Sequence, residues 1–352
     1  MEKQLQNNLP KVISIATSVP CYKLNQQDVK KLAIKIFDSR VDNFSRFLSV
    51  YDNASIQTRY SCVPLEWFEN PIGLAERNAL YIKNALNLLE EATIKSLDNA
   101  YLKLSDIDGI VVVSSSGIAT PSLDALLMER LKFRRTIERL PIFGLGCAGG
   151  VIGLARTAQL AKATPQKRYL YMVVELCGLT FLYEDKSRSN IIATALFGDG
   201  ASACIISCNG YGPEIMASHE HTWPDTLDVM GWGVTNHGLK AIFSQDIPTL
   251  IRNNMYDVVD YFLKQNNLSL SSIKNFLCHP GGTKVLDALE EILNLKSGSL
   301  IHSRTVMKNF GNMSAATIMF VLELALKNPQ AGLYLLSSLG PGFTAALLLM
   351  RM

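Results

Sequence analysis

The sequence predicts an α/β protein made of two similar halves, residues 1–210 and 211–352. Three observations indicate this fold class. Short apolar runs of strand length alternate with helical segments, stretches of the first half recur in the same order in the second, and each half contains one helix that is apolar on nearly all sides. We therefore expect two mixed sheets with two buried central helices between them.

The composition indicates a well-filled globular protein. The chain has 352 residues, of which 48% are hydrophobic and 18% charged, and it can bury a large core. Its formal net charge of +3 is too small for us to expect a nucleic-acid partner. No run approaches ~18 consecutive apolar residues, and the polar start "MEKQLQNNLPK" lacks the apolar core of a signal peptide. We expect no membrane span and a cytoplasmic location.

The seven cysteines are odd in number and include no CxxC pair. This pattern favours free thiols in a reducing compartment over a disulfide framework. It also argues against a zinc site, so we expect no metal.

The first repeated pair predicts a strand followed by a helix. "LKLSDIDGIVVVS", from Leu102, is similar to "LSLSSIKNFLCHP", from Leu268, because each gives a capping Ser, an Ile and then a short apolar run. A helix containing "LDAL" follows each run, at Leu123 and again at Leu286.

The second pair predicts the two buried helices. One begins at Gly146-Cys147 and the other at Gly311-Asn312, and the cysteine and the asparagine are 165 positions apart. A strand follows each helix, "YLYMVV" in the first half and "LYLLSS" in the second. If the two helices are related by an approximate two-fold axis, Cys147 and Asn312 lie near one cavity.

The third pair predicts a further strand in each half. "FGDGASACIIS", from Phe197, is similar to "LGPGFTAALLLM", from Leu339, since both read Gly-x-Gly-x-x-Ala before an apolar run. The order of all these matches indicates a duplication, with its boundary near "CNGYGPE", Cys208 to Glu214.

Cys147 lies in a collar of small residues, "GLGCAGG". At a helix N-terminus, unpaired N–H groups and the helix dipole would lower the pKa of the thiol and favour thiolate. The glycines would also let a substrate carbonyl approach closely. A buried structural cysteine is the alternative, but the glycine collar favours a nucleophile.

Two further residues suit acyl transfer with this thiol. His279, in "LCHPGG", follows a predicted buried strand, where open α/β sheets place their sites. The Asn312 amide could donate a hydrogen bond to an oxyanion without taking up a proton, although Asn is also a common helix cap. We interpret the other histidines as structural or solvated: His219, His221, His237 and His302.

With "GLGCAGG", "LFGDGAS", "CHPGGTKVLDALE", "FGNMSAAT" and "GPGFTAALL", the chain resembles a type III polyketide synthase, of the chalcone-synthase-like branch of the thiolase superfamily. The resemblance extends from about Val12 to the C-terminus. It implies the duplicated αβαβα thiolase fold, a homodimer, and an acyltransferase that loads an acyl group from acyl-CoA and extends it with malonyl-CoA. No metal or organic cofactor is implied, because loss of CO2 generates the carbanion once the oxyanion is stabilised.

The resemblance also assigns roles to residues. Cys147 matches the nucleophile and acyl carrier, His279 the residue that keeps the thiolate and polarises the malonyl thioester, and Asn312 its partner in decarboxylation. Phe197 matches the gatekeeper at the neck of the cavity. The other matched substrate-binding positions are Cys177, Thr180, Gly281, Leu339 and Ala241, the last of which replaces a second gatekeeper phenylalanine unless the alignment slips to Phe243.

Two stretches favour a particular starter. "SSSGIATPSLDALL" and "PIFGLGCAGG" resemble bacterial members that make alkylpyrones or alkylresorcinols from long acyl starters. A small residue at Ala241 would widen the neck. We therefore expect a medium- or long-chain fatty acyl-CoA starter and a pyrone or resorcinol-type product.

Three alternatives stay open at the level of the sequence. A papain-like hydrolase also has Cys, His and Asn in this order, and the gap of 132 residues between Cys147 and His279 fits it, but the duplication argues against it. A β-ketoacyl-carrier-protein synthase III has the same residue types, and the basic run "KFRRTIER", residues 132–139, could meet a carrier protein, although a solvated face or a dimer rim is the more ordinary role. The third alternative is a non-catalytic acyl-CoA-binding protein.

Overall fold

The structure is a computed structural model, and it describes residues 9–352. The polar start of the chain, which we used against a signal peptide, lies largely outside the described residues. The helices are α1 (Gln26–Phe37), α2 (Leu48–Asn53), α3 (Leu74–Ala100), α4 (Leu123–Leu131), α5 (Gly149–Ala163), α6 (Arg188–Leu196), α7 (Ile247–Gln265), α8 (Thr283–Ile292), α9 (Ile301–Phe310) and α10 (Thr317–Leu326).

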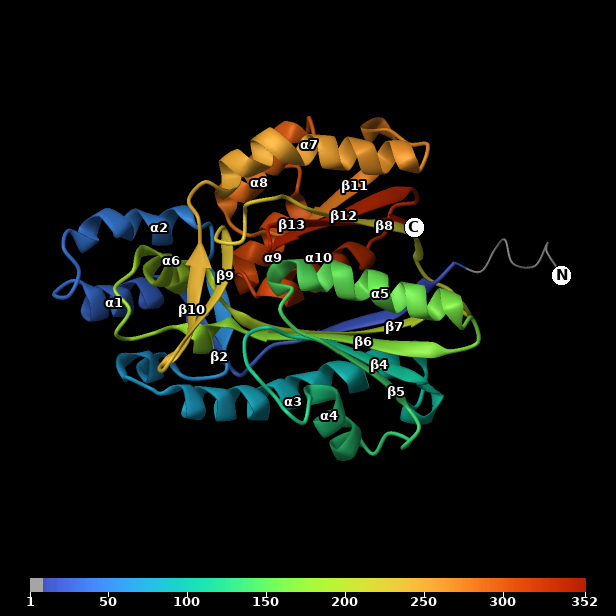
Figure 1. Ribbon diagram of the computed structural model, residues 1–352, viewed down its shortest axis with the longest axis horizontal. Coiled ribbons are helices and arrows are strands. Elements are labelled where there is room, and N and C mark those ends of the chain that lie inside the picture. The colour runs from blue at the N-terminus through green and yellow to red at the C-terminus, as the bar shows by residue number, and fades with distance from the viewer. Residues whose placement is uncertain (1–8) are drawn as a thin grey trace.

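Helices α3, α4, α5, α7, α8 and α10 stack with the sheets in five layers, and α1, α2 and α6 lie beside this stack (Figure 1). Helices α3 and α4 cover one outer face, and α7 and α8 cover the other. Helices α5 and α10 lie between the two sheets and contact strands of both. The layered α/β fold with two buried central helices, as the sequence predicts, is confirmed.

The strands of the first half are β1 (Lys11–Ser18), β2 (Tyr22–Asn25), β3 (Thr58–Ser61), β4 (Gly109–Val113), β5 (Glu138–Ile142), β6 (Arg168–Leu176) and β7 (Asp199–Ser207). Those of the second half are β8 (Glu214–Thr222), β9 (Met230–Thr235), β10 (Gly238–Phe243), β11 (Ile273–Cys278), β12 (Leu333–Gly340) and β13 (Thr344–Arg351). Two antiparallel pairs form small sheets of their own: β2 with β3, on either side of α1 and α2 in the chain, and β9 with β10, which form a hairpin.

The remaining strands are continuous in the order β11-β12-β13-β8-β1-β7-β6-β4-β5, so the two expected sheets are joined at their edges. The junction is a single residue pair, Lys11 with Glu214. On either side of it, Val12 N–H donates to the Pro213 carbonyl at 2.9 Å and Ile215 N–H to the Pro10 carbonyl at 2.8 Å. These bonds satisfy backbone groups that two separate sheet edges would leave open.

The pairing within each half shows the duplication. In the first half β4 is parallel to β6, which is antiparallel to β7, which is antiparallel to β1. In the second half β11, β12, β13 and β8 repeat this arrangement. The repeated stretches of sequence therefore fall on equivalent strands and helices.

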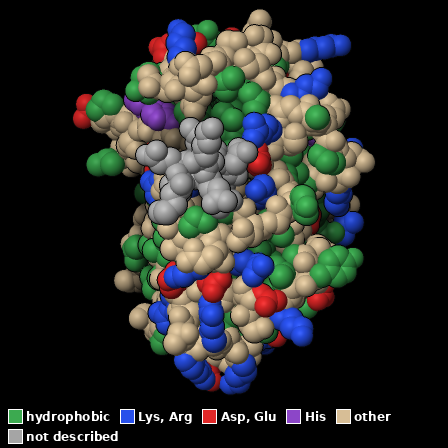
Figure 2. Space-filling model, turned by 90° about the vertical axis from the view of Figure 1, so that its right-hand side faces the viewer, with side chains coloured by type: hydrophobic (Ala, Val, Ile, Leu, Met, Phe, Trp, Pro, Cys, Tyr) green, Lys and Arg blue, Asp and Glu red, His purple; other side chains and the backbone are tan. Residues whose placement is uncertain are grey.

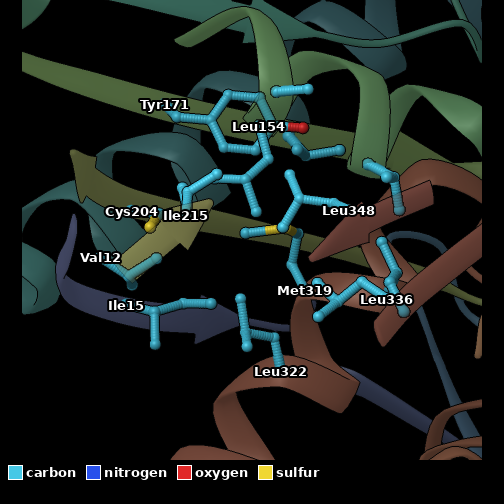
Figure 3. Packing of buried hydrophobic residues seen from close by; sticks show 14 of the residues in the cluster. Val12, Ile15, Leu154, Tyr171, Cys204, Ile215, Met319, Leu322, Leu336 and Leu348 are labelled. Carbon is cyan, nitrogen blue, oxygen red and sulfur yellow. The ribbon is translucent and has the colours of Figure 1, made fainter. Parts of the chain in front are cut away.

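The two halves share one hydrophobic core, part of which Figure 3 shows. Val12 and Tyr171 come from first-half strands, Leu154 from α5, Met319 from α10 and Leu348 from β13, and each is at most 2% exposed. Burial of one such side chain contributes about 1.5–3 kcal/mol. The central helices are therefore held by both sheets at once, which fixes the relative position of their N-termini.

Among residues 9–352, no helix combines the length and the apolar character needed to cross a bilayer.

Candidate active site

The three predicted polar residues line one cavity of about 120 Å³. Cys147 lies in a 3₁₀ turn, Gly146–Ala148, directly before α5. His279 follows the last residue of β11, and Asn312 precedes the turn that leads into α10. Each half thus supplies one central helix N-terminus, as the repeat predicts, and the second half adds the histidine at a strand end.

The Cys147 thiol is held as a hydrogen-bond donor rather than as a thiolate. Its S–H donates to Ser314 Oγ, with 3.4 Å between sulfur and oxygen. Burial raises the pKa of Cys147 to about 12, and the charge of Glu175 adds to the increase while the bond to Ser314 opposes it. Our expectation of a lowered pKa was wrong for the free thiol, because desolvation of the thiolate outweighs the helix terminus.

The His279 ring is 4% exposed, and neither ring nitrogen has a hydrogen-bond partner among the described residues. Its backbone N–H donates to the Ser337 carbonyl at 2.8 Å, which fixes the residue after β11. Burial lowers the pKa of His279 to about 4. The imidazole is therefore neutral at neutral pH, with one ring nitrogen available as a hydrogen-bond donor and the other as an acceptor.

Asn312 combines the two roles that the sequence left open. Its Oδ1 accepts from Ser314 N–H at 2.8 Å, which caps the turn before α10. Its Nδ2 donates to the Gly281 carbonyl over 3.4 Å, a long hydrogen bond that a better acceptor could replace. The amide is thus oriented by its oxygen and leaves its nitrogen available in the cavity.

Sequence reasoning missed polar residues around these three. Ser314 accepts the hydrogen bond from the thiol. It lines the cavity together with Ser337 and Ser338 of β12, and Ser338 Oγ has no hydrogen-bond partner among the described residues. Ser314 has a positive φ of 47°, uncommon outside glycine. The motif "GNMS" contains this serine, but no local pattern indicates that its side chain would contact the thiol.

Glu175 was also missed. It lies at the end of β6, is fully buried, and its carboxylate accepts from the N–H and the Oγ of Ser115 at 2.9–3.2 Å. Burial raises its pKa to about 7. Its apolar sequence context, "YMVVEL", resembles a plain core strand, so only the fold shows that its charge acts on Cys147.

The glycines around Cys147 serve packing more than substrate access. A Cβ on Gly150 would lie 2.3 Å from the Ala315 carbonyl oxygen, and one on Gly149 would lie 2.7 Å from Val113 Cγ1. The small residues therefore let α5 approach both the sheet and the turn before α10. This close approach brings Cys147 and Asn312 together, which corrects our interpretation that the collar makes room for the acyl group.

The predicted substrate-binding residues divide between two cavities. Phe197, Ala241, Gly281 and Leu339 line the catalytic cavity. Cys177 and Thr180 do not: they line a second cavity, of about 60 Å³, whose walls include residues of α1, β2, β3 and the C-terminal end of α6. Phe197 lines both cavities and therefore forms part of the partition between them.

Aromatic side chains as well as Ala241 surround the predicted neck of the catalytic cavity. Ala241 and Phe243 of β10 both line the cavity, together with Trp232 of β9. The Phe197 ring makes edge contacts with Trp232, with 6.0 Å between ring centroids, and with Phe243, at 6.4 Å. Aromatic rings thus line this part of the cavity together with Ala241, and a wide neck at Ala241 stays a prediction.

The basic run at 132–139 is not a helix face. It forms the turn after α4 and the start of β5. Its cations pair with nearby carboxylates: Lys132 and Arg135 with Glu129, Arg134 with Asp108, and Arg139 with Asp124. This local pairing of its charges does not favour an acidic carrier protein. Figure 2 shows positive and negative side chains intermixed on the face that it displays.

A cysteine, a histidine and an asparagine at the junction of two duplicated αβ halves define a condensing enzyme of the thiolase fold. The family model for the chalcone and stilbene synthase N-terminal domain matches residues 1–210, and that for the C-terminal domain matches residues 214–352. The chain therefore belongs to this family, the type III polyketide synthases, which are coenzyme A-dependent acyltransferases that condense malonyl-CoA.

Similar proteins span nearly the whole chain. A chalcone synthase-like protein of Bacillus subtilis is 38% identical, over 96% of this chain and 97% of its own length. The 1,3,6,8-tetrahydroxynaphthalene synthase of Streptomyces peucetius is 34% identical, over 97% and 92%. The crystal structure of the type III polyketide synthase domain of Steely1 from Dictyostelium superposes with a TM-score of 0.91 at 26% identity, over 97% of this chain and 99% of that domain. This membership excludes the papain-like hydrolase and disfavours the carrier-protein-dependent synthase.

Proposed function

We propose that the protein loads a medium- or long-chain fatty acyl group onto Cys147 and extends it with malonyl-CoA to a pyrone or resorcinol-type product. The observation that carries this proposal is the second apolar cavity directly behind Phe197. Its walls are mostly apolar, among them Val29, Ile36, Phe37, Leu65, Phe68 and Phe181. An acyl chain that passed the Phe197 ring would leave water for this space.

The neutral state of the three polar residues supports the loading step. As the Cys147 sulfur attacks the starter thioester, the neutral His279 ring can take the thiol proton and later return it to the departing coenzyme A thiol. The negative charge on the thioester oxygen then develops next to donors, the protonated imidazole and the Asn312 amide. The products are the acyl-cysteine and free coenzyme A.

The extension step uses the same two donors. When malonyl-CoA binds, its thioester oxygen would lie near the His279 ring and the Asn312 Nδ2. Loss of CO2 leaves an electron pair on the carbon next to that thioester, as an enolate whose oxygen these donors stabilise. The carbon then attacks the acyl-cysteine carbonyl and releases the Cys147 sulfur, so the chain grows by two carbons and is ready for transfer back.

Relatives support two product classes. The α-pyrone synthesis polyketide synthase-like protein Pks18 of Mycobacterium tuberculosis is 24% identical over 94% of this chain, and its name agrees with a pyrone. The Streptomyces peucetius relative is named for tetrahydroxynaphthalene, so a polyhydroxynaphthalene is the second candidate product. The apolar second cavity favours the alkylated product.

We also propose that the protein is a homodimer. Strand β5 has only β4 as a neighbour in the described structure, and it is exposed along its length. The Phe143 ring that follows it is 63% exposed. Light scattering on the purified protein tests this: we expect twice the mass of one chain, and the Phe143→Glu variant should lower it if β5 forms the interface.

The function itself is tested by mass spectrometry of the products from purified protein, malonyl-CoA and a ladder of acyl-CoA starters. We expect alkylpyrones or alkylresorcinols whose yield peaks at a medium or long chain. Tetrahydroxynaphthalene in their place would establish the second candidate. Release of coenzyme A without any extended product would contradict both.

A further inference from the structure

Arg59, on β3, is a buried cation that binds the end of a neighbouring helix. It is 3% exposed. Its Nη1 donates to the carbonyls of Thr194 at 2.7 Å and Phe197 at 2.9 Å, and its Nη2 donates to the carbonyl of Ala195 at 2.9 Å. These are carbonyls at the C-terminus of α6, where the helix leaves such groups unpaired and where the dipole favours a positive charge.

Gln26, the first residue of α1, completes this arrangement. Its Oε1 accepts from Arg59 Nη2, and its Nε2 donates to the carbonyls of Tyr51 and Ala195, each at 3.1 Å. Gln26 is itself 3% exposed. Arg59 and Gln26, which we call the α6 clamp, therefore hold the end of α6 from two other elements.

The α6 clamp acts on the backbone of Phe197. The Phe197 carbonyl is bound by Arg59, while the residues on either side of it bind Asn312: Asn312 N–H donates to the Leu196 carbonyl at 2.8 Å, and Gly198 N–H donates to the Asn312 carbonyl at 2.9 Å. The Phe197 main chain is thus fixed from both directions. Its ring can then stay between the catalytic and the second cavity.

From these contacts we infer that Arg59 is a positioning residue that holds Phe197 as the partition between the two cavities. Its planar fork reaches three carbonyls and the Gln26 oxygen, which the single point charge of lysine cannot do. If the second cavity takes the acyl chain, as the proposed function requires, the α6 clamp also helps to set the length of the starter.

The test compares Arg59→Lys with Arg77→Lys. Arg77, on α3, is a matched control because it is 4% exposed and its guanidinium also binds backbone carbonyls, those of Ile72 at 2.8 Å and Leu179 at 3.0 Å, without touching Phe197. The measured quantity is the rate at which iodoacetamide alkylates Cys177, which is 1% exposed in the second cavity, followed by peptide mass spectrometry. Since Leu179 lies in the same turn as Cys177, this control is a demanding one.

We expect Arg59→Lys to be alkylated at Cys177 about fivefold faster than Arg77→Lys. In the Phe197→Ala variant the partition is already removed. Adding Arg59→Lys to that variant should therefore leave the rate of Cys177 alkylation almost unchanged. Equal increases in both backgrounds, or no increase beyond the control, would overturn the inference. If Arg59→Lys does not fold, Gln26→Met gives the same comparison with the guanidinium retained.

A second measurement separates this inference from the proposed function. The ratio of kcat/KM for long over short acyl-CoA starters should change in Arg59→Lys and stay constant in Arg77→Lys. Faster labelling of Cys177 with an unchanged ratio would support the α6 clamp and refute the second cavity as the site of the acyl chain. An unchanged labelling rate with a synthase that works as proposed would refute the α6 clamp alone.

Discussion

The polar side chains that line the catalytic cavity are uncharged in the free protein at neutral pH. Burial lowers the pKa of His279 to about 4 and raises that of Cys147 to about 12, and Asn312 does not titrate. A neutral set avoids the free energy of burying an unpaired charge. Charge can then develop when a thioester provides the oxygen on which donors already act.

Replacement of the nucleophile separates the two half-reactions. In Cys147→Ala we expect no extended product, because no acyl group can be carried, while malonyl-CoA decarboxylation persists through His279 and Asn312. Acetyl-CoA release and ketide formation, both followed by mass spectrometry, measure these outcomes. Extended ketides from the variant would show that another residue carries the acyl group.

The Glu175 carboxyl makes a pH-dependent contribution to stability. Burial raises its pKa in the folded protein to about 7 from its ordinary value of 4.5, so the folded state binds an extra proton between these values. The contribution of this carboxyl to the free energy of unfolding is therefore most favourable below about pH 4.5. It falls by about 3 kcal/mol as the pH rises to 7. Glu175→Gln removes this titration. The free energy of unfolding of the variant, measured with urea, should therefore rise relative to that of the wild type between pH 5 and pH 8.

The matched control is Glu290→Gln. Burial alone would raise the pKa of Glu290, but bonds from Arg304 and from backbone N–H groups lower it. Its contribution to stability is therefore complete above the unfolded pKa and is lost only as the pH falls below it. The difference from wild type should stay flat between pH 5 and pH 8, and an equal slope in the two variants would contradict the role given to Glu175.

At the scale of elements, the β9–β10 hairpin narrows the catalytic cavity with Trp232 and Phe243, and α6 delivers Phe197 to the same place. Ala241 is the small position among these rings, 4% exposed and paired across the hairpin with Trp232. The size of the side chain at position 241 therefore sets how much space remains beside the Phe197 ring for an acyl chain.

Ala241→Phe should shift starter use toward short acyl-CoAs, because a fourth ring beside Phe197, Trp232 and Phe243 would take up space in the cavity. Loss of one buried methylene of substrate reduces kcat/KM about fourfold, from about 0.8 kcal/mol per group. The chain-length profile of products measures the shift. Val234→Phe, at a 73% exposed position of the same hairpin, is the control, and an unchanged profile in Ala241→Phe would refute the role of the hairpin in selection.

The elements show why sequence reasoning succeeded in some places and failed in others. The duplication and the placement of Cys147, His279 and Asn312 at one cavity could be predicted because repeated strands and helix starts carry their own local signals. The positions of Cys177 and Thr180 could not, since they depend on where the Phe197 ring divides the space. The pKa of Cys147 also depends on burial by both halves, which no local pattern contains.

For the whole molecule, the shared core means that the two halves stabilise each other. The central helices α5 and α10 contact both sheets, and the sheets themselves join at Lys11 and Glu214. Neither half keeps a complete core when the other unfolds. The duplication visible in the sequence is therefore a repeat of structure within one folding unit.

We expect a single cooperative unfolding transition in urea. Trp67 reports on the first half, whereas Trp223 and Trp232 report on the second, so variants that keep tryptophan in one half allow each to be followed by fluorescence. The two midpoints and slopes should coincide with each other and with circular dichroism, because loss of α5 or α10 exposes the core of both halves. Met319 is a fully buried residue of α10, and Met319→Ala should lower the free energy of unfolding by about 2–5 kcal/mol. Both urea midpoints should then fall together. Separate transitions, or a change confined to the second half, would show that the halves fold independently.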